Sequence, residues 1–387
     1  MKTNKFLLEL FTAVTILLVG CAADDTADVT VNINGGTNQN PSGTVIGGTL
    51  TGDLTLTTGT EYDLTSALIV PSGVTLTIEP GVVVRATTGS DVYVAVQQDG
   101  MIMAEGTSTN PIVFTSNSAT PNPGDWGGLI VLGRAPINSV VGGTATSTSE
   151  IGGLPYGGNM VNDNSGIIRY VRIEYSGGAA DAASENNGFS FYGVGNGTTI
   201  DFIQAFEGAD DGVEFFGGTV NASHISVVGA QDDSVDWTEG FTGTLTDIYI
   251  EHRQSHDKGI EGDGFNTDIG NNSNPVFWSA PTVNNITING LGSSNGNEAI
   301  RLRAGTRAIF NNVKLEGFEE GYDLDDSETG TGVTNGDTGV TDISFTDVTL
   351  NLKNDTGTMF DASTFFTGVG NGTGADYNSW NSGWTRN

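Results

Sequence analysis

The chain of 387 residues is predicted to be all-β and to form a single-stranded right-handed parallel β-helix, a solenoid with capped ends. From Val45 onward, short segments alternate apolar and polar residues, with little of the 3.6-residue periodicity of a helix. The 57 glycines and 10 prolines do not fit a long helical bundle. The alternating segments also repeat, and this repeat decides the fold class.

The repeat contains two strands. Seven segments share an Ile or Val, one further residue, an apolar residue and a turn, and their first apolar residues lie 22 to 38 residues apart: Val171, Ile203, Ile225, Ile248, Ile286, Val313 and Ile343. A second strand begins 9 to 18 residues after each of the first six, at Phe189, Val213, Val235, Ile260, Ile300 and Tyr322. Two strands per coil of roughly 22 residues indicate a parallel β-helix, since a propeller repeat is about 40 residues or longer.

The segments before Val171 continue the alternation, and VTLTIEPGV and AEGTSTNPIVFTS resemble the start of many bacterial right-handed β-helices. The open end of a β-helix is an unpaired edge that has to be covered. We therefore expect the aromatic tail, with Phe365, Phe366, Trp380 and Trp384, to cap the carboxyl end.

The first residues are predicted to be an export signal. Lys2 and Lys5 precede an apolar run, and residues 1–20 read as a signal peptide. The sequence Leu18-Val19-Gly20-Cys21 resembles a bacterial lipobox, which implies cleavage before Cys21 and lipidation of this single cysteine. The alternative is an ordinary signal peptide with a chance cysteine.

Residues 21–44 are predicted to be an acidic flexible tether, followed by the β-helix over residues 45–387. Asp24, Asp25 and Asp28 resemble the export signal of certain surface lipoproteins. We expect an outer-membrane location, with the protein anchored through lipid at Cys21 and exposed at the cell surface. The formal net charge of −32 excludes nucleic acid as a partner, because phosphate binding needs a basic surface.

Several segments resemble a known family: GDWGGLIVLGRAPIN, DNSGIIRYVRIEY, NGFSFYGVGNGTTID, DDGVEFFGGTVNASHI and the final SGWTRN. They are similar to a group of uncharacterised outer-membrane-type bacterial lipoproteins with a pectin-lyase-like right-handed β-helix. The resemblance covers most of residues 65–387. It implies the fold and the location, and it brings no reaction and no catalytic residues.

Strand alternation assigns the faces of the second strands. Their inward positions are apolar or Gly, which places Trp237 in the core. Their outward positions form two ladders, one containing Glu214, Asp236, Glu261 and Arg301, the other Tyr192, Phe216, Asp263 and Arg303. We expect Glu214, Asp236 and Glu261 to be exposed on one face, stacked about 4.8 Å apart.

The turns before these strands are acidic, which suggests a cation site. Two carboxylates so close oppose each other's ionisation, so a Ca²⁺ ion held by oxygen ligands is one solution. The candidate ligands are Asp210, Asp211, Asp232, Asp233 and Asp257. The alternative is a solvated face with turn-capping aspartates. Zinc is disfavoured, because the sequence has three histidines and no free cysteine once Cys21 is lipidated.

Two enzymatic interpretations stay open. Gln231-Asp232-Asp233 resembles an element of the polygalacturonase family of glycoside hydrolases, whose paired aspartates act as acid and base. The remaining elements depart from that family's pattern. Asn266-Thr267-Asp268 follows the Gln-Asp-Asp element, whereas the family's Asn-Thr-Asp element precedes it. No histidine is flanked by glycines, and Arg301-Leu302-Arg303 matches the family's Arg-x-Lys element imperfectly. The other possibility is a calcium-dependent polysaccharide lyase with Arg301 or Arg303 as base.

The favoured function is a cell-surface binding or adhesion module for glycans or partner proteins. The candidate ligand-binding residues are Tyr192, Glu214, Phe216, Asp236, Glu261, Asp263, Arg301 and Arg303. The alternatives are the calcium-dependent lyase or hydrolase and a structural surface-coat protein.

Overall fold

The computed structural model describes residues 43–139, 146–180, 184–267 and 274–387. The predicted signal peptide, Cys21 and nearly all of the predicted tether lie outside these ranges. Within them, no helix is both long enough and apolar enough to cross a membrane.

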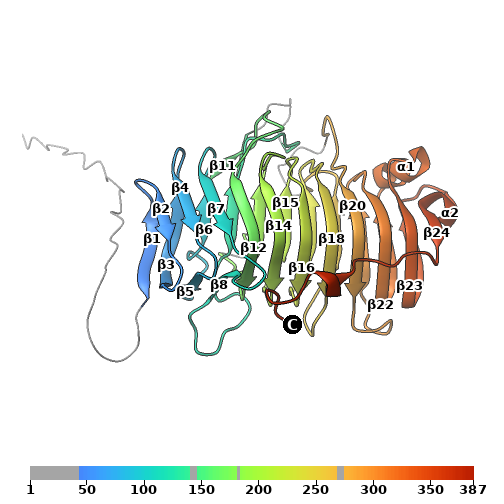
Figure 1. The fold of residues 1–387 in the computed structure, drawn as a ribbon. Helices are drawn as coiled ribbons and strands as arrows, with labels where there is room; N and C mark the ends of the chain where they lie inside the picture. Colours follow the sequence, from blue (N-terminus) through green and yellow to red (C-terminus); the bar gives the residue numbers. More distant parts are fainter. Residues whose placement is uncertain (1–42, 140–145, 181–183, 268–273) are drawn as a thin grey trace, which may run out of the picture.

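The chain is a parallel β-helix, as predicted. Strands of successive coils pair in parallel and stack from the blue to the red end of Figure 1. The strands confined to one sheet are β2 (Leu54–Leu56), β4 (Thr75–Ile78), β5 (Val83–Ala86), β6 (Val94–Val96), β7 (Met101–Glu105), β8 (Ile112–Ser116), β9 (Leu129–Leu132), β13 (Phe189–Tyr192), β15 (Val213–Phe216), β17 (Val235–Thr238), β19 (Ile260–Asp263) and β21 (Glu298–Arg303).

Longer strands bend around a corner and join two or three sheets. They are β1 (Thr44–Thr49), β3 (Glu61–Val70), β12 (Gly166–Glu174), β14 (Thr199–Phe206), β16 (Ala222–Val228), β18 (Thr244–Glu251), β20 (Thr282–Asn289), β22 (Ile309–Asp325) and β23 (Gly339–Asp355). The short strand β24 (Phe366–Val369) pairs with the start of β23. A short antiparallel pair, β10 (Ser147–Thr148) and β11 (Pro155–Tyr156), lies outside the solenoid sheets.

The predicted register is confirmed for both rows of apolar residues. Val171 pairs with Ile203, and the pairing continues without a slip through Ile225, Ile248, Ile286 and Val313 to Ile343. In the second row, Phe189 pairs with Val213, and the pairing continues through Val235, Ile260 and Ile300 to Tyr322. The sheet of this second row, β6, β9, β13, β15, β17, β19, β21 and the end of β22, is called the site sheet below.

The prediction of two strands per coil was incomplete, because a third sheet is present. Each first strand of the repeat bends at a left-handed residue in the same register, with φ between 49° and 61°, at Tyr170, Phe202, His224, Asp247, Asn285, Asn312 and Asp342. Asn and Asp tolerate this conformation better than other side chains. The corner residues also bind one another: Asn312 Nδ2 donates to Asn285 Oδ1 at 2.9 Å, and the Phe202 ring stacks on His224 at 3.9 Å.

The inward side chains of the site sheet form the core, as predicted. Val213, Phe215 and Val235 are fully buried, and so is Trp237. Trp237 fits because its neighbour in the next coil is Gly262, where a Cβ atom would lie 2.5 Å from the indole ring. Trp237 Nε1 donates to Thr306 Oγ1 at 3.1 Å.

The prediction for the carboxyl-terminal cap was half right. Phe365 and Phe366 pack on Tyr322, with ring centroids 5.2 and 5.6 Å away, beside the helices α1 (Ser327–Asn335) and α2 (Ala362–Phe365). Trp380 and Trp384 do not cap this end. After β24 the chain returns along the side of the solenoid through the 3-10 turn η1 (Tyr377–Ser379), and Trp384 is fully buried against Tyr170 (Figure 1). The tail follows this path because the aromatic side chains stacked at the corners of successive coils offer it a surface to pack on.

Candidate cation and ligand site

The two aromatic candidates, Tyr192 and Phe216, are not exposed, which corrects the prediction. Their rings stack 3.9 Å apart on the outer face of the site sheet, and each is about 2% exposed. Described parts of the segment between β9 and β12 pack on them: Ile151 belongs to the same apolar cluster, and the Tyr156 ring lies 4.8 Å from Tyr192. Tyr156 Oη donates to Glu239 Oε2 at 2.6 Å. These rings therefore form a secondary apolar cluster rather than a surface for a ligand.

The turns before β13, β15, β17 and β19 place equivalent residues on one line. The second position before each strand is occupied by Asn187, Asp211, Asp233 and Lys258. Asp211 Oδ1 accepts a hydrogen bond from the backbone nitrogen of Asp233 at 2.9 Å, and Asp233 Oδ1 accepts one from Lys258 at 2.8 Å. These two carboxylates hold successive turns together, which is the turn-capping role left open above.

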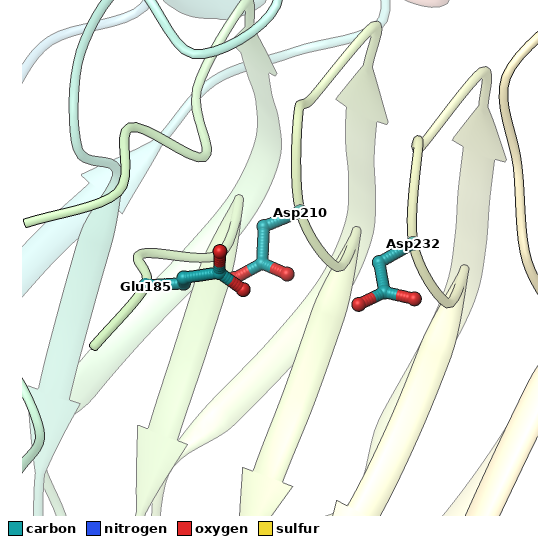
Figure 2. A group of neighbouring side chains, drawn as sticks. All are labelled: Glu185, Asp210 and Asp232. Atoms are coloured by element: carbon teal, nitrogen blue, oxygen red, sulfur yellow. The ribbon is translucent and has the colours of Figure 1, made fainter. Parts of the chain in front are cut away.

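The acidic turns and the acidic ladder enclose one pocket of about 230 Å³, called the acidic pocket below. It is lined by Glu150, Glu185, Asn187, Asp210, Asp211, Glu214, Asp232, Asp233, Asp236 and Glu261. Figure 2 shows Asp210 and Asp232 on two successive turns, with Glu185 beside Asp210 on the segment before β13. Their carboxylate oxygens lie within 4.8 Å of one another.

Carboxylate oxygens also lie close together on the inner wall of the pocket. Oxygens of Asp211, Glu214 and Asp236 lie within 4.8 Å of one another, and so do those of Asp233, Asp236 and Glu261. Glu214 and Asp236 are half-buried and Glu261 is 7% exposed, so the prediction of an exposed face was wrong. The turns and the covering segment shield the ladder from water.

Burial and mutual repulsion raise the pKa of most of these carboxyl groups. Burial, followed by the charges of Glu185 and Asp232, raises the pKa of Asp210 to about 8. Burial also raises the pKa of Asp236 well above its usual value, with Glu261 as the next cause. Glu214 behaves in the same way, with the charge of Asp236 second. The pocket therefore favours protons, or another cation, on its oxygens.

Positive side chains neutralise only one end of the pocket. Lys258 Nζ lies 3.5 Å from Asp233 and 3.3 Å from Glu261, and Arg303 pairs with Glu261. Among the residues that the structure describes, no ion pair reaches the other five aspartates and glutamates at the centre: Asp210, Asp211, Glu214, Asp232 and Asp236. Asp236 Oδ1 is buried and has no hydrogen-bond partner within the described ranges.

The remaining candidates lie beside the pocket. Asp257 does not join it, because its carboxylate pairs with Lys258 Nζ at 2.6 Å and is about half exposed. Asp263 is buried and pairs with Arg303 Nε at 2.6 Å. Arg301 Nη2 lies 2.7 Å from Asp325 Oδ2. The arginines thus continue the ladder as an ion-pair network.

The ion-pair network affects whether an arginine of the site can act as a base. Burial opposes the charge of Arg303, but Asp263 and Glu261 outweigh it and raise the pKa of the guanidinium. A guanidinium held in this state is a poor base. The pocket offers oxygen ligands in number, and oxygen is what Ca²⁺ takes.

Four residues of the site region were not predicted from the sequence. Asn187 and Lys258 were recoverable, since the confirmed register aligns them with Asp211 and Asp233. Glu150 and Glu185 lie in insertions outside the repeat, and no periodic signal identifies them.

Comparison with known proteins identifies a family. Residues 48–385 match the sequence model of a family described as "Pectate-lyase like beta helix domain". No curated protein matches the chain significantly.

Proposed function

Because the chain belongs to the pectate-lyase-like β-helix family, we propose that it is a carbohydrate-binding protein of the cell surface whose acidic pocket holds a Ca²⁺ ion. The ion would be bound by side chains of the turns and of the site sheet, and it would present open coordination positions to sugar oxygens. A hydroxyl or carboxylate of a glycan would complete its shell.

One observation carries this proposal: the pocket gathers more carboxylates than its neighbours neutralise. Five of them have no ion pair within the described ranges, and Asp236 Oδ1 is buried without a partner. Unpaired charge of this kind is expensive inside a protein unless a cation or a proton compensates it. The raised pKa of Asp210 has the same cause.

The geometry favours binding over turnover. The lyase alternative needs Arg301 or Arg303 as a base, yet each guanidinium is held by carboxylates at 2.7 Å or less. The hydrolase alternative needs Asp232 and Asp233 as an acid–base pair, and one oxygen of Asp233, Oδ1, is already committed to the backbone of Lys258. Neither alternative has an observation of its own in support.

The test measures calcium and glycan binding together. Titration calorimetry with CaCl₂ should detect a site that is lost in the double variant Asp211→Asn, Asp236→Asn. The matched control is Asp257→Asn, which removes a neighbouring carboxylate outside the pocket. A glycan array and a reducing-end assay, each in CaCl₂ and in EDTA, should show calcium-dependent retention without release of product.

Three outcomes would contradict the proposal: no calcium heat, a heat that the double variant retains, or glycan retention that EDTA leaves unchanged. Release of a product would show that the protein cleaves the glycan and does not only bind it.

The surface location is part of the proposal, and it rests on the lipobox resemblance at Cys21. Cys21→Ser should move the protein from the membrane fraction to the soluble fraction. If the variant stays with membranes after a salt wash, lipidation at Cys21 is not what anchors the chain.

A further inference from the structure

A second cavity, of about 460 Å³, lies where β21 and β22 leave the site sheet. Two aromatic rings, Phe265 and Trp278, contribute to its wall, together with Arg303 and the carboxylates of Asp325, Asp326 and Glu328. A cavity of this volume, with aromatic walls and a few polar groups, has the dimensions of a small-molecule site. It is called the tryptophan pocket below, and it shares only the neighbourhood of Arg303 with the acidic pocket.

Trp278 is held in place before any ligand arrives. The guanidinium of Arg307 lies 5.0 Å from the centre of its ring. Gly305 approaches the indole so closely that a Cβ atom there would lie 2.8 Å from Nε1. Trp278 Nε1 is buried and has no hydrogen-bond partner among the described residues. A rigid ring loses little conformational entropy when a ligand binds against it.

Two of the three carboxylates of the pocket, Asp325 and Asp326, are fixed as well. Asp326 caps helix α1, and its Oδ1 accepts from the backbone nitrogen of Thr329 at 2.8 Å. Asp325 accepts from Arg301 Nε at 2.8 Å. Asp326 also accepts from the backbone nitrogen of Ala304 and from Thr329 Oγ1. A carboxylate has room for about four hydrogen bonds, so Asp325 has more capacity than Asp326 to accept donors from a ligand.

The charge of the pocket selects among ligands. Three carboxylates line it against one guanidinium, and that guanidinium already pairs with Asp263 and Glu261. An anionic ligand such as a uronate would face repulsion from these three carboxylates. A neutral sugar presents an apolar C–H surface to the aromatic rings and a rim of hydroxyl donors to the carboxylates.

We propose that the tryptophan pocket binds a neutral sugar residue without a metal ion. It is a second site, independent of the acidic pocket. The paired residues Glu261 and Arg301, and Asp263 and Arg303, lead from one pocket toward the other along the site sheet. One glycan chain lying along this sheet can therefore contact both.

The experiment is run in EDTA, so that calcium binding plays no part. The probes are neutral hexaoses (mannohexaose, xylohexaose and cellohexaose), the cationic chitosan hexamer and anionic hexagalacturonate, measured by titration calorimetry. We expect at least one neutral hexaose to bind. Trp278→Ala should weaken its Kd at least tenfold, and Trp278→Phe should weaken it less.

The matched control is Trp380→Ala, since Trp380 is half-buried in the returning tail, away from the pocket. This variant should leave the Kd unchanged. Because EDTA removes calcium throughout, binding of a neutral hexaose in this buffer separates failure of this site from failure of the calcium site.

Four results would overturn the proposal: no binding of any neutral hexaose, tight binding of the chitosan hexamer alone, tight binding of hexagalacturonate, or a folded Trp278→Ala variant with unchanged affinity. The second result would assign the pocket to an ammonium group instead. If Trp278→Ala does not fold, Trp278→Phe decides, because any loss of affinity in the folded Phe variant places the sugar at this ring.

Discussion

Asp236→Asn should stabilise the protein when no divalent cation is present. Asp236 lies at the centre of the acidic pocket, where its oxygens are within 4.8 Å of those of Asp211 and Glu214, and also of those of Asp233 and Glu261. Its Oδ1 is buried without a hydrogen-bond partner in the described ranges. Asn has nearly the same shape and removes the charge, so the substitution relieves repulsion without opening a cavity.

The size of the effect follows from Coulomb's law. Two unit charges 4.8 Å apart repel by roughly 3.5 kcal/mol at an effective dielectric constant of about 20. The raised pKa of Asp236 and of its neighbours means that protons already remove part of this repulsion. We therefore expect the free energy of unfolding to rise by about 1–3 kcal/mol at pH 8, and the gain to vanish near pH 4, where the carboxyls are protonated.

The assay is urea unfolding in EDTA at pH 4 and pH 8, with matched NaCl. Asp233→Asn is the control, because Asp233 is engaged with the backbone and with Nζ of Lys258 and should give no gain. If Asp236→Asn is no more stable than the wild type at pH 8, the pocket is not electrostatically strained, and the argument for a cation there fails.

Three further predictions concern the same fold. Without divalent cations, wild-type stability should fall as the pH rises from about 4 to about 8. The folded state keeps a proton on Asp210, whose pKa is about 8, whereas the unfolded chain releases this proton near pH 3.8. A thermal midpoint that rises over this pH range would contradict the prediction. Val235→Asp should lower the free energy of unfolding by more than ~4 kcal/mol, since it buries an unpaired charge in the core; urea unfolding checks this. Gly262→Ala should lower it by about 1–3 kcal/mol through overlap with Trp237, and an unchanged urea midpoint would refute that contact.

The sequence alone determined the solenoid, the register and the direction in which the side chains of the site sheet point. This was possible because each coil packs on its immediate neighbours, so a periodic pattern identifies the paired residues. Val213, Val235 and Ile260 are vertically adjacent for this reason, and Trp237 lies in the core opposite Gly262.

Tertiary structure alone decided what happens at the outer surface of the coils. Tyr192 and Phe216 occupy outward positions, yet a segment from outside the repeat covers them. Glu185 reaches the acidic pocket from an insertion, and Trp384 returns to the middle of the solenoid instead of capping its end. Insertions and tails have no coil above or below to set their position, so their path depends on which surface buries the most apolar area. Period and alternation carry no information about that choice.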